Sequence, residues 1–178
     1  MSIKKIKVGI QGKYSIIDSE FFDLVKDMTW GEGGAAKGKP QYVRHQKYNR
    51  DTKERSYISL HRYIYESKFG KLKKGQEIDH INGNRFDNRL CNLRACTHQQ
   101  NSFNYGKKPT RAKIYSKYKG VWYRNEEGRI KRWTAEIKIN YKKKYIGTFL
   151  TEKEAAIAYN EKATELHGKF AFLNNINN

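Results

Sequence analysis

The sequence predicts an α+β protein with two domains. The first contains a strand–loop–strand–helix core, and the second is a three-stranded antiparallel sheet packed on one helix. Short apolar segments separated by polar turn residues between 77 and 104 indicate the first. The second is indicated by strict alternation of apolar and polar residues over 132–140, followed by a capped helical pattern that starts after Thr151.

The chain is strongly basic. It has 178 residues and a formal charge of +19. Such a charge attracts polyanions, with an affinity that falls as salt rises. Thirteen Tyr and three Trp interleave with the basic residues, which favours nucleic acid over a lipid surface as the partner. No long apolar run or signal-peptide pattern occurs, so we expect a cytoplasmic protein that is neither secreted nor membrane-bound.

The first part of the chain carries weaker signals. Lys7–Ile17 alternates enough to predict strands, and Ser19–Met28 has roughly helical apolar spacing. Asp18 or Ser19 could cap that helix. Gly31–Pro40 is rich in glycine and is interpreted as a hairpin connection, because it lacks the ending of a phosphate-binding loop.

A pair of strands and a helix are expected next. Tyr42–Gln46 and Arg55–Leu60 are predicted to pair, and Leu60–Phe69 is predicted to be a helix that stops at Gly70. Two interpretations of His61 stay open: a contact with phosphate or with the site, and a structural hydrogen bond.

The middle of the chain predicts the compact core. Glu77–Ile81 is expected to be a strand, and Asn82-Gly83 is a strong turn signal. Asn88–Arg94 could return as a second strand, and Thr97–Asn104 could form a helix capped by Thr97. Strand, loop, strand and helix can then bring the two ends of this segment to one point.

The polar residues of this core suit phosphodiester cleavage. Asp79 and Asn101 offer oxygen atoms to a hard cation such as Mg²⁺. A neutral His80 beside that cation can take a proton from water. Arg89 and Arg94 have two open interpretations, pairing with an acidic residue of the loop or holding phosphate.

These residues also carry a family resemblance. The pattern DHINGN, DNR, NLR and QN between Asp79 and Asn101 resembles the HNH endonucleases, the ββα-metal nucleases, and especially the homing type encoded by phages and introns. The resemblance implies that His80 is the general base and that Asp79 and Asn101 bind one divalent ion, Mg²⁺ or Mn²⁺. It implies that Asn92, the middle Asn of the catalytic motif, braces the two strands. The last motif position is Asn rather than His, as is common in the homing branch.

The resemblance sets the expected domain bounds. Residues 1–106 would form the nuclease region with its motif at 77–104, followed by a basic linker at 107–116. That linker could track along phosphates or simply be solvated. Cys91 and Cys96 have no second pair, which excludes a four-cysteine zinc site, and both are interpreted as small buried residues.

The C-terminal third predicts a separate domain at 117–174. Tyr118–Arg124, Arg132–Asn140 and Lys143–Phe149 are expected to be strands. Thr151 and Glu154 form a capping box for a helix with a face of small apolar residues, which can lie close to the sheet.

This region resembles the plant DNA-binding domain of the ethylene-response-factor (Apetala) type, through YKGVWYR, WTAEIKI, YIGTF and the helix that follows. The resemblance implies that the sheet lies in the major groove of DNA. It implies DNA contacts from six positions: Lys119, Trp122, Arg124, Lys138, Lys143 and Tyr145. Trp122 stands where plant members often have a base-contacting Arg, so their target sequence does not transfer.

Together these features predict a site-specific homing endonuclease that acts on double-stranded DNA by a single-metal mechanism. One active site cuts one strand, so a monomer, which is favoured over a dimer, should nick. The alternative is a non-catalytic, sequence-specific DNA-binding regulator with a vestigial nuclease domain. An RNA-directed nuclease is disfavoured because no RNA-recognition motif is found.

Overall fold

The computed structural model describes residues 2–33, 41–106, 116–125, 128, 130, 132–140 and 142–177. The chain divides into two compact units, Met1–His98 and Gln99–Asn178. Most of the expected linker and the middle of the expected turn at 125–128 lie outside the described residues. The domain boundary expected at residue 106 stays a prediction.

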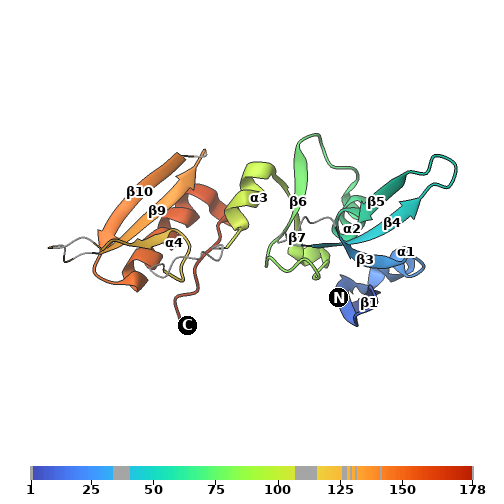
Figure 1. Ribbon diagram of the computed structural model, residues 1–178, viewed down its shortest axis with the longest axis horizontal. Coiled ribbons are helices and arrows are strands. Elements are labelled where there is room, and N and C mark those ends of the chain that lie inside the picture. The colour runs from blue at the N-terminus through green and yellow to red at the C-terminus, as the bar shows by residue number, and fades with distance from the viewer. Residues whose placement is uncertain are drawn as a thin grey trace. The chain divides into compact units, whose positions relative to one another are not determined.

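The first unit contains a five-stranded sheet and a separate two-stranded hairpin (Figure 1). Its elements are β1 (Ile3–Val8), β2 (Lys13–Asp18), η1 (Ser19–Phe21), α1 (Phe22–Val25), β3 (Trp30–Gly33), β4 (Tyr42–Tyr48), β5 (Arg55–Ser59), α2 (Leu60–Phe69), β6 (Gln76–His80), η2 (Leu90–Asn92) and β7 (Leu93–Thr97). The strands of the larger sheet lie in the order β2-β1-β3-β4-β5, with β1 and β3 parallel and the other neighbours antiparallel.

One apolar core joins the sheet, the helix α2 and the β6–β7 hairpin. Its buried members include Ile17 from β2, Leu60 and Ile64 from α2, and Ile78 and Leu93 from the hairpin. The hairpin that carries the predicted motif is therefore packed against the N-terminal elements. Burying each such side chain contributes about 1.5–3 kcal/mol, so these elements stabilise one another.

Several local predictions are confirmed. The helix α2 has the predicted bounds and ends at Gly70, whose φ of 82° suits glycine. The strands β4 and β5 pair as expected. β3, which the sequence did not predict, pairs with β4 through Trp30 and His45, at the start of the glycine-rich stretch.

The helix expected at Ser19–Met28 is much shorter than predicted. A 3₁₀ turn is followed by a single helical turn at Phe22–Val25. Asp18 does not cap it, because its carboxylate oxygen Oδ2 accepts a 2.7 Å hydrogen bond from the backbone N–H of Leu90. A distant part of the chain therefore uses the candidate capping residue.

The second strand of the motif also begins later than expected. The sequence favours a strand at Asn88–Arg94, whereas Leu90–Asn92 forms a 3₁₀ turn and β7 starts at Leu93. Side-chain hydrogen bonds of Asp87 and Asn92 hold the chain in this turn, and such local polar contacts compete with strand pairing.

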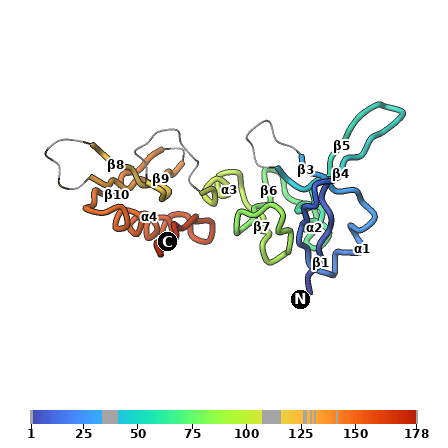
Figure 2. The backbone as a smooth tube through the Cα atoms, turned by 60° about the horizontal axis from the view of Figure 1, so that its bottom comes forward, coloured from blue at the N-terminus to red at the C-terminus, as the bar shows by residue number. Residues whose placement is uncertain are grey.

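The second unit is a three-stranded antiparallel sheet covered on one face by a helix, as predicted (Figure 2). Its elements are α3 (His98–Asn104, whose first residue belongs to the first unit), β8 (Val121–Tyr123), β9 (Trp133–Ile139), β10 (Lys142–Phe149), α4 (Glu152–His167) and η3 (Gly168–Phe170). The strand order is β10-β9-β8.

Small residues allow α4 to lie close to the sheet. Ala155, Ala156 and Ala163 are fully buried, and they pack with Ala135 and Ile137 of β9 in the core of this unit. The predicted capping box is present, with Thr151 and Glu154 hydrogen-bonded reciprocally.

Two further observations concern exposure. Cys96 is buried, but Cys91 is exposed in η2, so the expectation that both are buried is wrong for Cys91. Within the described part of the chain, we find no helix with the length and apolar character needed to cross a membrane.

Candidate active site

The β6–β7 hairpin carries the two central residues of the predicted site. Asp79 and His80 are the last residues of β6, and they lie opposite Arg94 and Leu93 of β7. Both are buried, at 5% and 4% exposure. Since a buried charged or polar side chain needs partners, their surroundings decide their chemistry.

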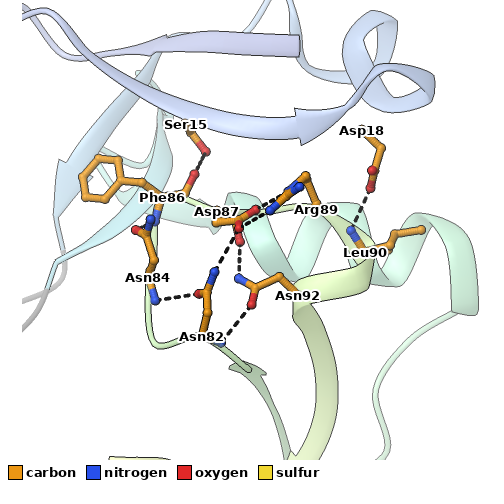
Figure 3. A network of polar contacts seen from close by, with 9 residues as sticks. All are labelled: Ser15, Asp18, Asn82, Asn84, Phe86, Asp87, Arg89, Leu90 and Asn92. Carbon is orange, nitrogen blue, oxygen red and sulfur yellow. Dashed lines mark hydrogen bonds and ion pairs between the residues drawn. The ribbon is translucent and has the colours of Figure 1, made fainter. Parts of the chain in front are cut away.

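A polar network shapes the loop between these strands (Figure 3). The Asn92 side chain accepts from the backbone N–H of Asn82 at 2.9 Å and donates to the carbonyl of Asp87 at 2.7 Å. The Asp87 carboxylate accepts 2.7 Å hydrogen bonds from Nε and a terminal nitrogen of Arg89, and a 3.0 Å bond from Asn82. These bonds lower the pKa of Asp87. Arg89 therefore pairs with Asp87, and Asn92 ties both ends of the loop together.

His80 is held by Asn88. Its Nε2 atom lies 3.1 Å from Oδ1 of Asn88, which is completely buried. Burial lowers the pKa of His80 below its ordinary value of 6.5, and the hydrogen bond with Asn88 opposes part of that shift. A neutral imidazole at neutral pH can accept a proton, as a general base must.

Two rings from other elements lie near His80, and the guanidinium of Arg85 stacks on one of them. The ring of His61 lies 5.1 Å from that of His80, and the ring of Tyr42 lies 6.2 Å from it. The guanidinium of Arg85 stacks 4.2 Å from the centre of the Tyr42 ring. Burial and then the neighbouring His80 lower the pKa of His61 to about 3. Of the two interpretations of His61, proximity to the site is therefore the one that this geometry favours.

Asp79 is engaged by an arginine. Arg94 donates from Nε and from a terminal nitrogen to Oδ2 of Asp79, at 2.9 and 2.6 Å. The Arg94 side chain is only 13% exposed, so this ion pair is largely shielded from water. The pair holds the carboxylate of Asp79, the residue before His80 in β6, in one orientation.

The carboxylate of Asp79 is the kind of oxygen ligand that a hard cation such as Mg²⁺ prefers. Asp79 supplies a carboxylate, and Mg²⁺ is commonly bound through one or two carboxylates together with waters and substrate phosphates. The described residues contain no cluster of three or more His, Cys, Asp or Glu side chains that could enclose a metal. Asn101 lies on α3 in the second unit, so its pairing with Asp79 stays a prediction.

In the second unit, most of the predicted DNA-contact residues share the sheet face opposite α4. Strand register places Trp122 beside Thr134, and Lys143 beside Lys138. The ammonium of Lys143 lies 5.0 Å from the centre of the Trp122 ring and 3.1 Å from the Glu136 carboxylate.

The other three predicted contact residues differ in their surroundings. Tyr145 is exposed, and its hydroxyl lies 2.6 Å from that of Thr148. The backbone N–H of Arg124 bonds Arg132 at the end of the same sheet. Lys119 is half-buried, and its ammonium donates to the carbonyl of Phe103 at 2.6 Å. Burial lowers the pKa of Lys119 to about 8, so this residue is in a different environment from the exposed lysines.

Sequence reasoning missed four residues that contact the site residues directly or through one neighbour: Ser15, Tyr42, Arg85 and Asn88. Ser15 and Tyr42 come from β2 and β4, far from the motif in sequence, and no local pattern connects them to it. Asn88 and Arg85 lie inside the motif segment. In the sequence, nothing distinguishes a buried Asn whose amide is hydrogen-bonded at both ends from an ordinary turn residue.

Comparisons with known proteins match a segment that includes the β6–β7 hairpin. Residues 59–103 match the family model for HNH endonucleases. The chain is 39% identical over 120 residues to a protein of Acanthamoeba polyphaga mimivirus described as an uncharacterized HNH endonuclease. That match covers 67% of this chain and 58% of the viral protein, so the chain spans little more than half of its relative. No solved structure matches the chain.

Proposed function

We propose that this chain, which carries an HNH endonuclease family domain at residues 59–103, is a metal-dependent, site-specific DNA endonuclease of the homing type. The observation that carries the proposal is the buried pair of Asp79 and His80 at the end of β6. Asn88 is hydrogen-bonded to His80, and burial keeps the imidazole neutral, while Arg94 orients the carboxylate of Asp79.

The proposed chemistry is hydrolysis of one phosphodiester bond. His80 takes the proton of the attacking water. Asp79 and Asn101 would hold one Mg²⁺ or Mn²⁺ ion, which stabilises the charge on the phosphate and on the departing oxygen when it is bound. Asn92 keeps the loop closed so that His80 stays at the end of its strand. By family resemblance, the products carry a 5′-phosphate and a 3′-hydroxyl.

The C-terminal sheet is proposed to anchor the enzyme on double-stranded DNA, as its likeness to the ethylene-response-factor type suggests. Trp122, Lys138, Lys143 and Tyr145 lie on the face that α4 leaves open. Lysines on such a face position a protein on phosphates without reading sequence. Lys119 differs from them, because its ammonium already donates to the backbone carbonyl of Phe103.

The β4–β5 hairpin supplies another basic surface on the nuclease unit. It extends beyond the neighbouring strands of its sheet in both views (Figure 1, Figure 2), and residues 46–57 are all exposed. It carries five basic residues, Arg44, Lys47, Arg50, Lys53 and Arg55, against two acidic ones, Asp51 and Glu54. Side chains alternate along a strand, so Tyr42, which lies beside His80, shares its face of β4 with Arg44. DNA lying along this face would lead into the site.

A nicking assay tests the proposal. Supercoiled plasmid and phage DNA are incubated with the full chain and Mg²⁺, with or without EDTA. Open-circular product that requires the metal supports a nicking enzyme, whereas linear product indicates paired sites. Tight binding to a demonstrated target without any cleavage would contradict the proposal and favour a non-catalytic regulator.

A further inference from the structure

A chain of buried hydrogen bonds connects His80 to the N-terminal sheet. Nε2 of His80 lies 3.1 Å from Oδ1 of Asn88, and Nδ2 of Asn88 donates to Oγ of Ser15 at 2.7 Å. Oγ of Ser15 in turn donates to the carbonyl of Phe86 at 2.9 Å. Ser15 and Asn88 are both 0% exposed, and His80 is 4% exposed. Solvent therefore has little access to these hydrogen-bonded side chains.

Donor and acceptor chemistry sets the direction of each hydrogen bond between His80 and Phe86. A carbonyl oxygen only accepts, so the single hydroxyl proton of Ser15 is used on Phe86. Oγ of Ser15 must then accept from Asn88, which places the amide nitrogen of Asn88 on that side. The carbonyl of Arg85, 3.2 Å from the same nitrogen, requires the same orientation. Oδ1 of Asn88 consequently faces His80, and the Nε2 atom of His80 must carry the hydrogen.

This arrangement decides which nitrogen can act as the base. A neutral imidazole carries one proton, and here that proton is on Nε2, so Nδ1 is the atom that accepts another. We infer that Asn88 and Ser15 are positioning residues that hold His80 in the tautomer with Nδ1 as the proton acceptor. The inference rests on the proposed function, because it assigns these residues to the base of that reaction.

The strand β2 is built to deliver Ser15 to this position. The backbone N–H of Ile16 donates to the carbonyl of Phe86, and that of Asn88 donates to the carbonyl of Ile16, both at 2.8 Å. These two bonds hold Phe86 and Asn88 against β2. Ser15 lies outside residues 59–103, so the N-terminal sheet completes the active site rather than merely preceding it.

The tautomer can be measured without any reference to cleavage. Two-bond ¹H–¹⁵N spectra of the ¹⁵N-histidine-labelled, metal-free full chain separate protonated from unprotonated ring nitrogens. The signals that disappear in His80→Gln identify His80 among the five histidines. The wild-type protein should show a protonated Nε2. Asn88→Ala should bring in the form protonated at Nδ1, whereas Asn88→Asp keeps an oxygen opposite Nε2 and should retain the original form.

Kinetics provide the second readout. For metal-binding histidines, losing the partner that orients the ring costs about 10–100-fold in activity, and we expect Asn88→Ala to lower kcat by a similar factor. KM and the DNA dissociation constant should hardly change, because Asn88 and Ser15 are buried. Ser15→Ala should have a smaller effect in the same direction, since the Arg85 carbonyl still orients the amide. Ser67→Ala is the matched control: its hydroxyl also donates to a carbonyl, that of Ile64 at 2.7 Å, within α2.

The outcomes separate this inference from the proposed function. An active wild-type enzyme whose folded Asn88→Ala and Ser15→Ala variants keep both the original tautomer and kcat would overturn the inference alone. If Asn88→Ala does not fold, Ser15→Ala decides by the same two measurements. A wild-type chain that cleaves no DNA would remove the proposed function, while the spectra would still show whether Asn88 sets the tautomer.

Discussion

Replacing Asn92 by alanine should loosen the loop that ends at His80. The side chain of Asn92 satisfies the backbone N–H of Asn82 and the backbone carbonyl of Asp87, and Asn92 is 5% exposed. Leaving a buried polar group without its partner costs about 1–3 kcal/mol. The Asp87 bond is buried and the Asn82 bond is only partly buried, so water can replace the second more easily. The free energy of unfolding of the first unit should therefore fall by about 2–4 kcal/mol.

Urea denaturation followed by circular dichroism and tryptophan fluorescence measures this loss, with DNA cleavage assayed in parallel. Asn84→Ala is the matched control in the same loop. Its side chain accepts one exposed hydrogen bond, from the N–H of Phe86 at 3.0 Å (Figure 3). Removing a single exposed bond should cost about 1 kcal/mol or less. Equal losses in Asn92→Ala and Asn84→Ala would refute the bracing role of Asn92.

Three other changes test separate parts of the site. His61 has a pKa of about 3 in the folded chain against 6.5 ordinarily, so its unfolded form binds more protons between these values, and its contribution to stability falls as pH drops below 6.5, by up to about 1.4 kcal/mol per pH unit. His61→Gln should reduce the loss of stability between pH 7 and pH 5 in urea denaturation, while the buried His80 keeps a part of it, and an unchanged loss would contradict the assignment. Asp79→Asn should destabilise the chain by about 3–5 kcal/mol, because it leaves the shielded Arg94 without its carboxylate. In thermal unfolding, the double variant Asp79→Asn/Arg94→Met should recover this stability, but Mg²⁺ should no longer stabilise it. Stabilisation by Mg²⁺ that survives in the double variant would show that the ion binds elsewhere. Lys143→Ala should reduce the slope of log Kd for DNA against log salt by about 0.9 in fluorescence anisotropy, since one phosphate contact is lost, and an unchanged slope would remove Lys143 from the DNA surface.

Local signals were sufficient for several elements. The helix α2 could be placed from its apolar spacing and from Gly70, and α4 from the capping box of Thr151 and Glu154. The alternation along β9 predicted which face would meet α4. In these segments the decisive contacts lie within a few residues, or follow from one repeated pattern.

The errors have a common physical cause, which is contact between distant segments. Asp18 resembled a helix cap, but the N–H of Leu90 takes its carboxylate. Leu90–Asn92 resembled a strand, but the loop network folds it into a turn. Ser15 gave no signal at all, because its role depends on a hydrogen bond to Asn88, 73 residues away in the sequence.

The candidate site itself could be predicted in part. The motif placed Asp79 and His80 side by side, and the structure adds that both are buried and individually held. The motif could not reveal that Arg94 engages Asp79 or that the ring of His61 lies near His80. Both contacts depend on the register of β6 with β7 and on the packing of α2.

The most direct test of His80 as the general base is single-turnover cleavage of supercoiled target DNA in Mg²⁺ by the wild-type chain and by His80→Ala. His45→Ala is the matched control, because His45 lies in the same unit and its ring bonds only the carbonyl of Thr29 among the hydrogen bonds described for it. We expect that His80→Ala binds DNA normally and cleaves it about 10²–10⁴-fold more slowly, whereas His45→Ala cleaves like the wild type. Wild-type cleavage that survives undiminished in His80→Ala would contradict the assignment of His80 as the general base.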